Sequence, residues 1–178
     1  MTTRDRYWDL WEGEEGTIAM PVAQWRSQFR APAAVYPDAD FLPDAVSIFY
    51  TAETPGDMPL YAQVNLEPDP EDGGPAVPTV LIGSVPDEGD MLFLFDTDKG
   101  EVLYLDLREG IPELVNSSLR TFVDFLYELT LFVDADTGLA GRAERARTLH
   151  QRLLSIDAAA FAESDSWWSV AFQQLESA

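Results

Sequence analysis

The hydrophobic and polar positions divide the chain into a central part with strand patterns and a later part with helix patterns. Residues 60–66 alternate between apolar and polar side chains, the period-two pattern of a half-buried strand, and residues 46–50 suggest another. Two apolar runs, at 79–82 and 91–95, lack this alternation, as expected for strands covered on both faces. A fifth strand is expected at 101–107. Five successive strands with short connections favour a largely antiparallel sheet.

Helical periodicity begins at Asn116. Apolar residues then recur at steps of three and four, at Leu119, Phe122, Val123, Leu126, Leu129 and Val133. Asn116 or Ser117 is expected to cap this helix, since a short polar side chain accepts a hydrogen bond from an otherwise unpaired backbone N–H. Further helices are expected at 138–156 and 166–176.

The first thirty residues also have helical character, interrupted at 12–16, with a second helix expected to open at Pro21. Strands followed by helices predict an α+β protein rather than alternating βαβ units. We therefore expect one domain over 1–178. It would contain a helical part at 1–30, a sheet of five or six strands at 45–107, and a helical part at 116–176.

Composition narrows the functional classes. The chain has 32 Asp and Glu against 11 Lys and Arg, a formal net charge of −21, which argues against binding to nucleic acid or to anionic membranes. It has no cysteine and one histidine, so thiol chemistry and a conventional zinc site are excluded. Without a signal-peptide pattern or an apolar run of about 18 residues, the chain is expected to be cytoplasmic.

The acidity is concentrated in residues 31–98, which hold fourteen acidic residues, ten of the twelve prolines, and no Lys or Arg. One interpretation is a solvated surface that maintains solubility. The other is an acidic face that imitates a phosphate backbone and binds the basic cleft of a protein partner. The candidate contact residues are the loop carboxylates Glu67, Asp69, Glu71, Asp72, Asp87, Glu88, Asp90, Asp96 and Asp98.

Catalytic and metal-binding alternatives are weaker. Asp96, Asp98 and Gly100 resemble part of a calcium loop, but an EF-hand needs Gly at position six and Glu at position twelve, where this chain has Leu107. A hairpin turn is the favoured interpretation. A hydrolase that uses loop carboxylates stays an alternative, although solvent would leave such groups with ordinary pKa values. We expect no cofactor, no metal and no enzymatic activity.

Three features of the predicted helices have both a structural and a functional interpretation. His150 is expected to be a half-buried structural side chain. Trp167 and Trp168 are adjacent, about 100° apart on a helix, so one would be in the core and the other could be an exposed interface anchor. The arginines Arg142, Arg145, Arg147 and Arg152 would balance charge locally or pair with a second copy, giving a monomer or a weak homodimer.

Two motifs resemble those of a known family. Residues 95–102 (FDTDKGEV) form the expected hairpin turn, and residues 114–126 (LVNSSLRTFVDFL) follow it at the start of a helix. Together with the tryptophan-containing C-terminal helix, they resemble bacterial immunity proteins of the SUKH superfamily, most closely the fourth SUKH family, over residues 79–175. The first seventy residues show no matching pattern, and the Pro-rich acidic insert at 67–78 departs from the family.

The resemblance implies an α+β fold with a sheet flanked by helices. It also implies a cytoplasmic antidote that binds a polymorphic toxin, often a nuclease or deaminase, and that has no catalytic residues. Asn116, Ser117, Ser118 and Leu119 match the family motif, and we interpret them as a helix start joined to the core. The leading hypothesis is an immunity protein that neutralises a toxin domain with a basic cleft. The alternative is a regulatory or scaffolding module of the same fold.

Overall fold

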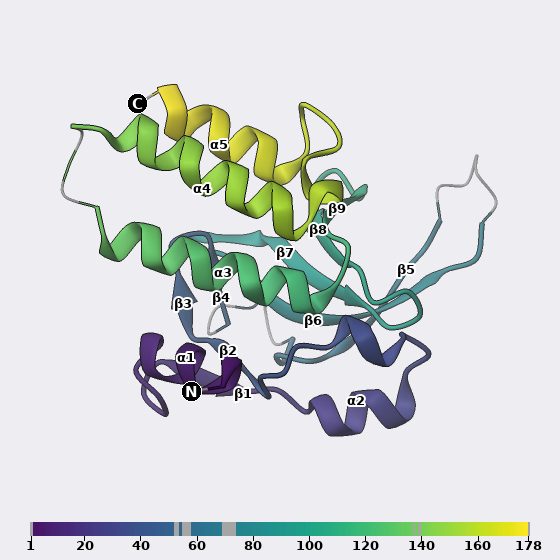
Figure 1. Cartoon of the computed structure of the whole chain (residues 1–178). Helices are drawn as coiled ribbons and strands as arrows, with labels where there is room; N and C mark the ends of the chain where they lie inside the picture. The colour runs from purple at the N-terminus through teal and green to yellow at the C-terminus, as the bar shows by residue number, and fades with distance from the viewer. Residues whose placement is uncertain are drawn as a thin grey trace.

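The computed structural model describes residues 2–51, 54, 58–68, 74–136, 138 and 140–177. An antiparallel sheet forms one layer, and helices pack on one side of it (Figure 1). The sheet has seven strands: β3 (Ala45–Val46), β4 (Phe49–Tyr50), β5 (Gln63–Leu66), β6 (Val77–Val85), β7 (Glu88–Asp96), β8 (Val102–Asp106) and β9 (Pro112–Asn116). Six of them follow the order β3-β4-β6-β7-β8-β9, and β5 also pairs with β6. The α+β prediction is confirmed.

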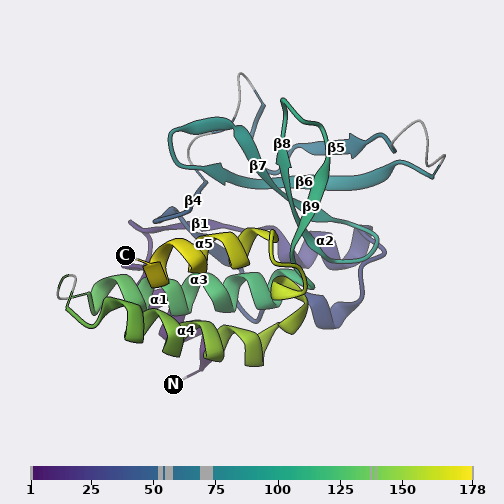
Figure 2. The same ribbon diagram turned by 90° about the horizontal axis from the view of Figure 1, so that it is seen from above.

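The central strands β6, β7 and β8 bury both of their faces. Successive side chains of a strand point to opposite faces, so each apolar run is divided between two clusters. The helix-facing cluster contains Val80, Ile82, Phe93, Phe95, Val102 and Tyr104. The opposite cluster contains Leu66, Leu81, Leu92, Leu94, Leu103 and Leu105, enclosed by the curl of the sheet seen in Figure 2. The absence of alternation in these runs is thereby explained, and the prediction of strands covered on both faces is confirmed.

Helix α3 (Leu119–Asp134) packs on the sheet, with α4 (Arg142–Ile156) and α5 (Trp167–Ser177) beside it (Figure 2). Five of the six positions in the predicted period, from Leu119 to Leu129, lie on its buried face, whereas Val133 in the last turn is 46% exposed. The Phe122 ring on that face lies 5.3 Å from the ring of Phe49 and 5.5 Å from that of Phe93.

The start of α3 differs from the prediction. Ser118 is the N-cap, and its Oγ accepts a hydrogen bond from the Thr121 N–H at 3.1 Å. Asn116 is instead the last residue of β9, an edge strand that the sequence analysis did not predict. The predicted cap at Asn116 or Ser117 is wrong because the chain is still extended there, and the sheet ends at residue 116 rather than 107.

The N-terminal part is less helical than predicted. Helix α1 (Thr3–Leu10) and helix α2 (Val22–Gln28) are separated by β1 (Thr17–Ala19), which pairs with β2 (Phe41–Pro43). Strands of three residues are too short to show a period of two, so neither strand was predicted. Short 3-10 turns complete the fold at Ala33–Val35 (η1) and Ala158–Phe161 (η2).

Two predicted strands are shorter in the structure. The pattern at 60–66 forms a strand only from Gln63, because residues 60–61 make a turn in which Tyr61 has a φ of +68°. The pattern at 46–50 is a tight hairpin, in which Val46 pairs with Phe49. Of the apolar positions in these two patterns, only Val46 and Leu66 are buried, and the others are half-buried, while Phe49, which lies outside the alternating pattern, is fully buried. Both patterns misjudge where the chain reverses.

Candidate functional site

Two hairpins meet at one end of the sheet. The β6–β7 hairpin turns at Pro86 and Asp87, and the β8–β9 hairpin turns at residues 107–111. Since Met91 of β7 pairs with Asp106 of β8, both turns lie at the same end. The Leu107 N–H donates a hydrogen bond to the Asp90 carbonyl at 2.9 Å, which joins the two turns. Residues 86–90 and 107–113 are called the hairpin end below.

The hairpin end is acidic, with apolar side chains in its middle. Its exposed carboxylates are Asp87, Glu88, Asp90, Glu109 and Glu113. Leu107 is 47% exposed and Ile111 is 66% exposed. Its one basic residue, Arg108, is bound through Nε and Nη2 to the two carboxylate oxygens of Asp106, at 3.0 and 2.8 Å. These bonds hold the pKa of Asp106 below its usual value, and the Arg108 guanidinium is also attracted to the carboxylates of Glu88 and Asp90.

The acidic surface continues from the hairpin end along β9. Glu113 lines a shallow hollow of about 320 Å³ together with Glu163 and Asp165, which come from the loop before α5. Both loop residues are exposed. Carboxylates from the β8–β9 hairpin and from a distant loop therefore share one side of the molecule.

The predicted contact residues do not form one face. Asp87, Glu88 and Asp90 lie at the hairpin end, whereas Glu67 and Asp98 are exposed at the opposite end of the sheet. The nine residues of β7 separate the two groups by roughly 25 Å. The stretch 31–98 is therefore continuous in sequence but divided in space. The remaining loop candidates, Asp69, Glu71 and Asp72, lie outside the described residues.

Asp96 belongs to the interior of a turn. It is 1% exposed, and its Oδ1 accepts hydrogen bonds from the backbone N–H groups of Asp98 and Lys99, both at 2.8 Å. The prediction of a hairpin turn here, rather than a calcium loop, is confirmed. Because its carboxylate is engaged inside the protein, Asp96 is not part of the contact surface considered below.

Sequence reasoning missed four residues of the hairpin end: Leu107, Glu109, Ile111 and Glu113. Their position depends on β9, whose short sequence starts at Pro112 and has no clear alternation. A signal was present in Glu109-Gly110, an acidic residue and a glycine directly after an apolar strand, and Gly110 adopts a φ of +73° in the turn.

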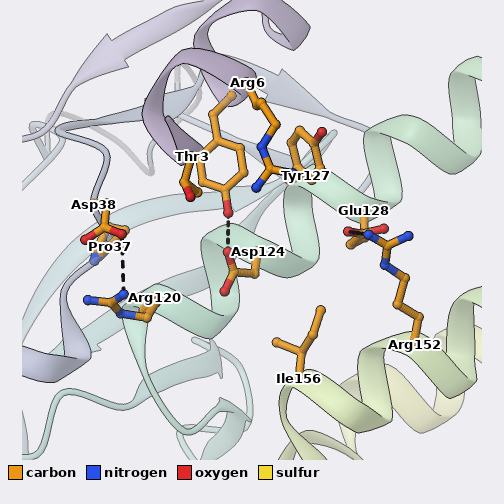
Figure 3. Close-up of a pocket in the computed structure, with 11 residues that line it drawn as sticks. Thr3, Arg6, Pro37, Asp38, Arg120, Asp124, Tyr127, Glu128, Arg152 and Ile156 are labelled. Atoms are coloured by element: carbon orange, nitrogen blue, oxygen red, sulfur yellow. Dashed lines mark hydrogen bonds and ion pairs between the residues drawn. The ribbon is translucent and has the colours of Figure 1, made fainter. Parts of the chain in front are cut away.

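A cleft of about 240 Å³ between α1, α3 and α4 holds two carboxylates whose pKa values are raised (Figure 3). Burial raises the pKa values of Asp124 and Glu128, a pattern typical of acid/base sites. Yet Tyr7 of α1 donates a hydrogen bond to Asp124, and the Arg152 Nη2 of α4 lies 2.7 Å from the Glu128 Oε1. These contacts attach two helices to α3, and we interpret the cleft as a structural joint.

The family motif forms a second joint, which is buried. Asp157 is 5% exposed, and its Oδ2 accepts hydrogen bonds from the Asn116 Nδ2 at 3.1 Å, the Ser117 N–H at 2.8 Å and the Thr121 Oγ1 at 2.8 Å. The Asn116 Oδ1 accepts a further bond from the Trp168 Nε1 at 3.1 Å. The Asp157 carboxylate thus joins the end of α4 to β9 and to the start of α3, and Asn116 adds α5 to this joint.

The aromatic residues of the last helices are structural. Trp168 is 1% exposed, and the Trp167 ring packs 4.6 Å from the Tyr104 ring, so the hypothesis of an exposed tryptophan anchor does not hold. His150 is half-buried as predicted, with its ring 4.6 Å from Phe161 and 4.9 Å from Phe172.

The predicted arginine cluster balances charge locally at three of its four positions. Arg142 and Arg145 both bind the carboxylate of Asp136, and this pairing lowers the Asp136 pKa. Arg152 binds Glu128 as described above.

Within the part of the chain that the structure describes, no group of three or more His, Asp or Glu side chains is placed to hold a metal ion. None of the described helices has the length and apolarity to cross a membrane.

Comparison with protein families gives one finding. The model described as SUKH-4 immunity protein matches residues 19–174, from the end of β1 into α5 and including the buried joint around Asn116. Searches of curated proteins and of solved structures give no match. Proteins of this family neutralise toxins and are not enzymes, which confirms the prediction of a non-catalytic protein. The chain belongs to the SUKH-4 immunity protein family.

Proposed function

We propose that this immunity protein neutralises a toxin domain that acts on nucleic acid, and that its acidic surface occupies the basic cleft of that domain. Family membership supports a toxin partner. The observation that carries the finer proposal is the hairpin end, where five exposed carboxylates surround a turn whose single arginine is bound to Asp106.

The physical reason is charge complementarity. A toxin that grips nucleic acid must line its cleft with Lys and Arg, because phosphate contacts supply most of its affinity. A protein with a net charge of −21 is attracted to such a cleft at long range. Complementary charges chiefly accelerate association and select the partner, and the association rate constant can reach about 10⁸–10⁹ M⁻¹s⁻¹ at low salt.

Co-expression tests toxin neutralisation. The toxin domain encoded beside this gene should stop growth when it is produced alone and should be harmless when it is produced with this protein. If the toxin stays lethal although this protein is present and folded, the immunity function is wrong, and a regulatory module of the same fold becomes the better explanation.

Stopped-flow association tests the acidic interface. The rate constant should fall at least tenfold between about 50 mM and about 500 mM NaCl, because salt screens charges beyond a few ångströms. The double reversal Glu88→Lys with Asp90→Lys should slow association at low salt about tenfold or more. The matched reversal Glu67→Lys with Asp98→Lys, at the other end of the sheet, makes the same change in net charge and should have a much smaller effect. Equal effects of the two pairs, or no salt dependence, would contradict an interface at the hairpin end.

A further inference from the structure

We infer that the toxin docks on the tip of the β8–β9 hairpin, with Ile111 and Leu107 as apolar anchors and the surrounding carboxylates as a rim that guides the encounter. The inference rests on the proposed function, because it takes the basic cleft of the toxin as the occupant. It adds a part of the interface that charge alone does not provide.

Two large apolar side chains are exposed on one turn of the β8–β9 hairpin. Ile111 is 66% exposed and Leu107 is 47% exposed. The four other exposed large apolar residues of the described chain lie on helices: Leu131 and Val133 on α3, Leu154 on α4 and Val170 on α5. Neighbouring exposed apolar side chains within a polar rim are typical of protein interaction sites.

Hydrogen bonds within the hairpin fix this turn before any partner binds. The Asp106 carboxylate accepts hydrogen bonds from the Arg108 N–H at 2.8 Å and from its guanidinium. The Asp106 carbonyl accepts two more, from the Glu109 N–H at 3.1 Å and the Gly110 N–H at 2.8 Å. A turn held in this way loses little conformational freedom on binding, so more of the contact energy appears as affinity.

The carboxylates around Leu107 and Ile111 determine which kind of partner can bind there. Leu107 and Ile111 lie between the carboxylates of Glu88, Asp90, Glu109 and Glu113. A second copy of this chain would bring the same carboxylates against them, and an anionic membrane would be repelled. A basic cleft with an apolar floor fits both the rim and the centre.

The two parts of the surface should have different kinetic roles. Rim charges act while the partners are still apart and therefore set the association rate. Apolar anchors act only after contact, in a desolvated centre, and therefore set the dissociation rate. The experiment uses this difference.

The test is surface plasmon resonance with the immobilised toxin domain and the double variant Leu107→Ala with Ile111→Ala. Dissociation should become about 100-fold faster, with the association rate changed less than about threefold. The matched variant Leu154→Ala with Val170→Ala removes two other exposed apolar side chains, 38% and 41% exposed, from the helices and should dissociate as the wild type does. Thermal unfolding should show that both variants are folded, since all four side chains are exposed.

The outcomes separate the two proposals. If the wild type binds the toxin and the hairpin variant dissociates no faster than the wild type, docking on this hairpin is wrong while the immunity function stands. If the wild type does not bind the toxin domain at all, the proposed function fails. If both double variants dissociate faster by a similar factor, the interface is wider than the hairpin tip and the inference is overturned.

Discussion

Asp157 and Asp90 show how differently two carboxylates can act in a strongly acidic protein. Asp157 is 5% exposed and accepts three hydrogen bonds from Asn116, Ser117 and Thr121. Asp90 is exposed, and its carboxylate is attracted to Arg108 by charge alone. The first carboxylate holds the helices on the sheet, and the second faces solvent, where a partner can reach it.

Burial and nearby hydrogen-bond donors, rather than the number of acidic residues, therefore decide what a carboxylate does. Removing a buried acceptor leaves donors that have lost both water and their partner, which costs about 1–3 kcal/mol for each group. Removing an exposed carboxylate leaves nothing unsatisfied. The net charge of −21 thus combines structural groups with groups that are available for binding.

The largest expected effect follows from Asp157→Ala. It would leave the Asn116 amide and the Ser117 N–H without their acceptor, whereas the Thr121 hydroxyl can still donate to the Ser118 carbonyl, so the free energy of unfolding should fall by about 3 kcal/mol. Urea unfolding followed by tryptophan fluorescence measures it. Asp157→Asn is the control, since its amide oxygen can still accept and the loss should be smaller. If the urea midpoint of Asp157→Ala equalled that of the wild type, the buried Asp157 carboxylate would not be what holds the helices on the sheet.

The role of Asp157 could not be predicted from the sequence because its partners are distant. They lie 36 to 41 residues away, and only folding brings them together. Local patterns succeeded where the signal was local. The long apolar runs identified β6 and β7, the periodicity from Leu119 identified α3, and the Asp96–Gly100 segment identified a turn.

The candidate surface was predicted only in part for a related reason. Asp87, Glu88 and Asp90 were recognised because their sequence predicts an acidic turn, although only Asp87 lies in the turn and Glu88 and Asp90 belong to the start of β7. Leu107 and Ile111 were missed because an exposed apolar residue resembles a core residue until the neighbouring strand is known. The absence of basic residues from 31–98 suggested one face, but strand pairing places its loops at two ends of the sheet.

A smaller loss is expected for Asp96→Ala, which removes the acceptor of two backbone N–H groups inside the β7–β8 turn. The free energy of unfolding should fall by about 2 kcal/mol. Asp96→Asn keeps the accepting oxygen and should lose less. Asp98→Ala, in the same turn but exposed, should stay within about 0.5 kcal/mol of the wild type in the same urea assay. Similar losses for Asp96→Ala and Asp98→Ala would show that burial does not distinguish them.

The pH dependence of stability offers a finer test through Asp124. Burial raises its pKa above the ordinary value of 3.8, so the folded protein holds this proton more tightly than the unfolded chain does. Its contribution to stability is therefore fully present below pH about 4 and is lost as the pH rises through the folded pKa. Asp124→Asn cannot titrate but still accepts from Tyr7, so its stability relative to the wild type should improve as the pH rises through that range.

The contribution of Asp136 to stability should depend on pH in the opposite direction to that of Asp124, in the same urea unfolding experiments. Its bonds to Arg142 lower its pKa, so its contribution is present above pH about 4 and is lost as the pH falls through the folded pKa. The gap between the wild type and Asp136→Asn should therefore shrink on acidification. If both variants changed in the same direction relative to the wild type, the separation into buried and ion-paired carboxylates would be wrong.

The smallest expected effect is that of Glu88→Lys with Asp90→Lys on folding. Both side chains are exposed at the hairpin end, so the free energy of unfolding should change by less than about 0.5 kcal/mol. Each reversal adds two charges, which moves the net charge from −21 to −17 and weakens self-repulsion, so a slight gain is more consistent than a loss. Asp87 is left unchanged because its φ of +61° suits Asp better than Lys. A marked loss of stability would mean that these rim carboxylates hold the two hairpins together, as Asp157 holds the helices. Weaker binding of this variant to the toxin could then no longer be assigned to the loss of direct contacts.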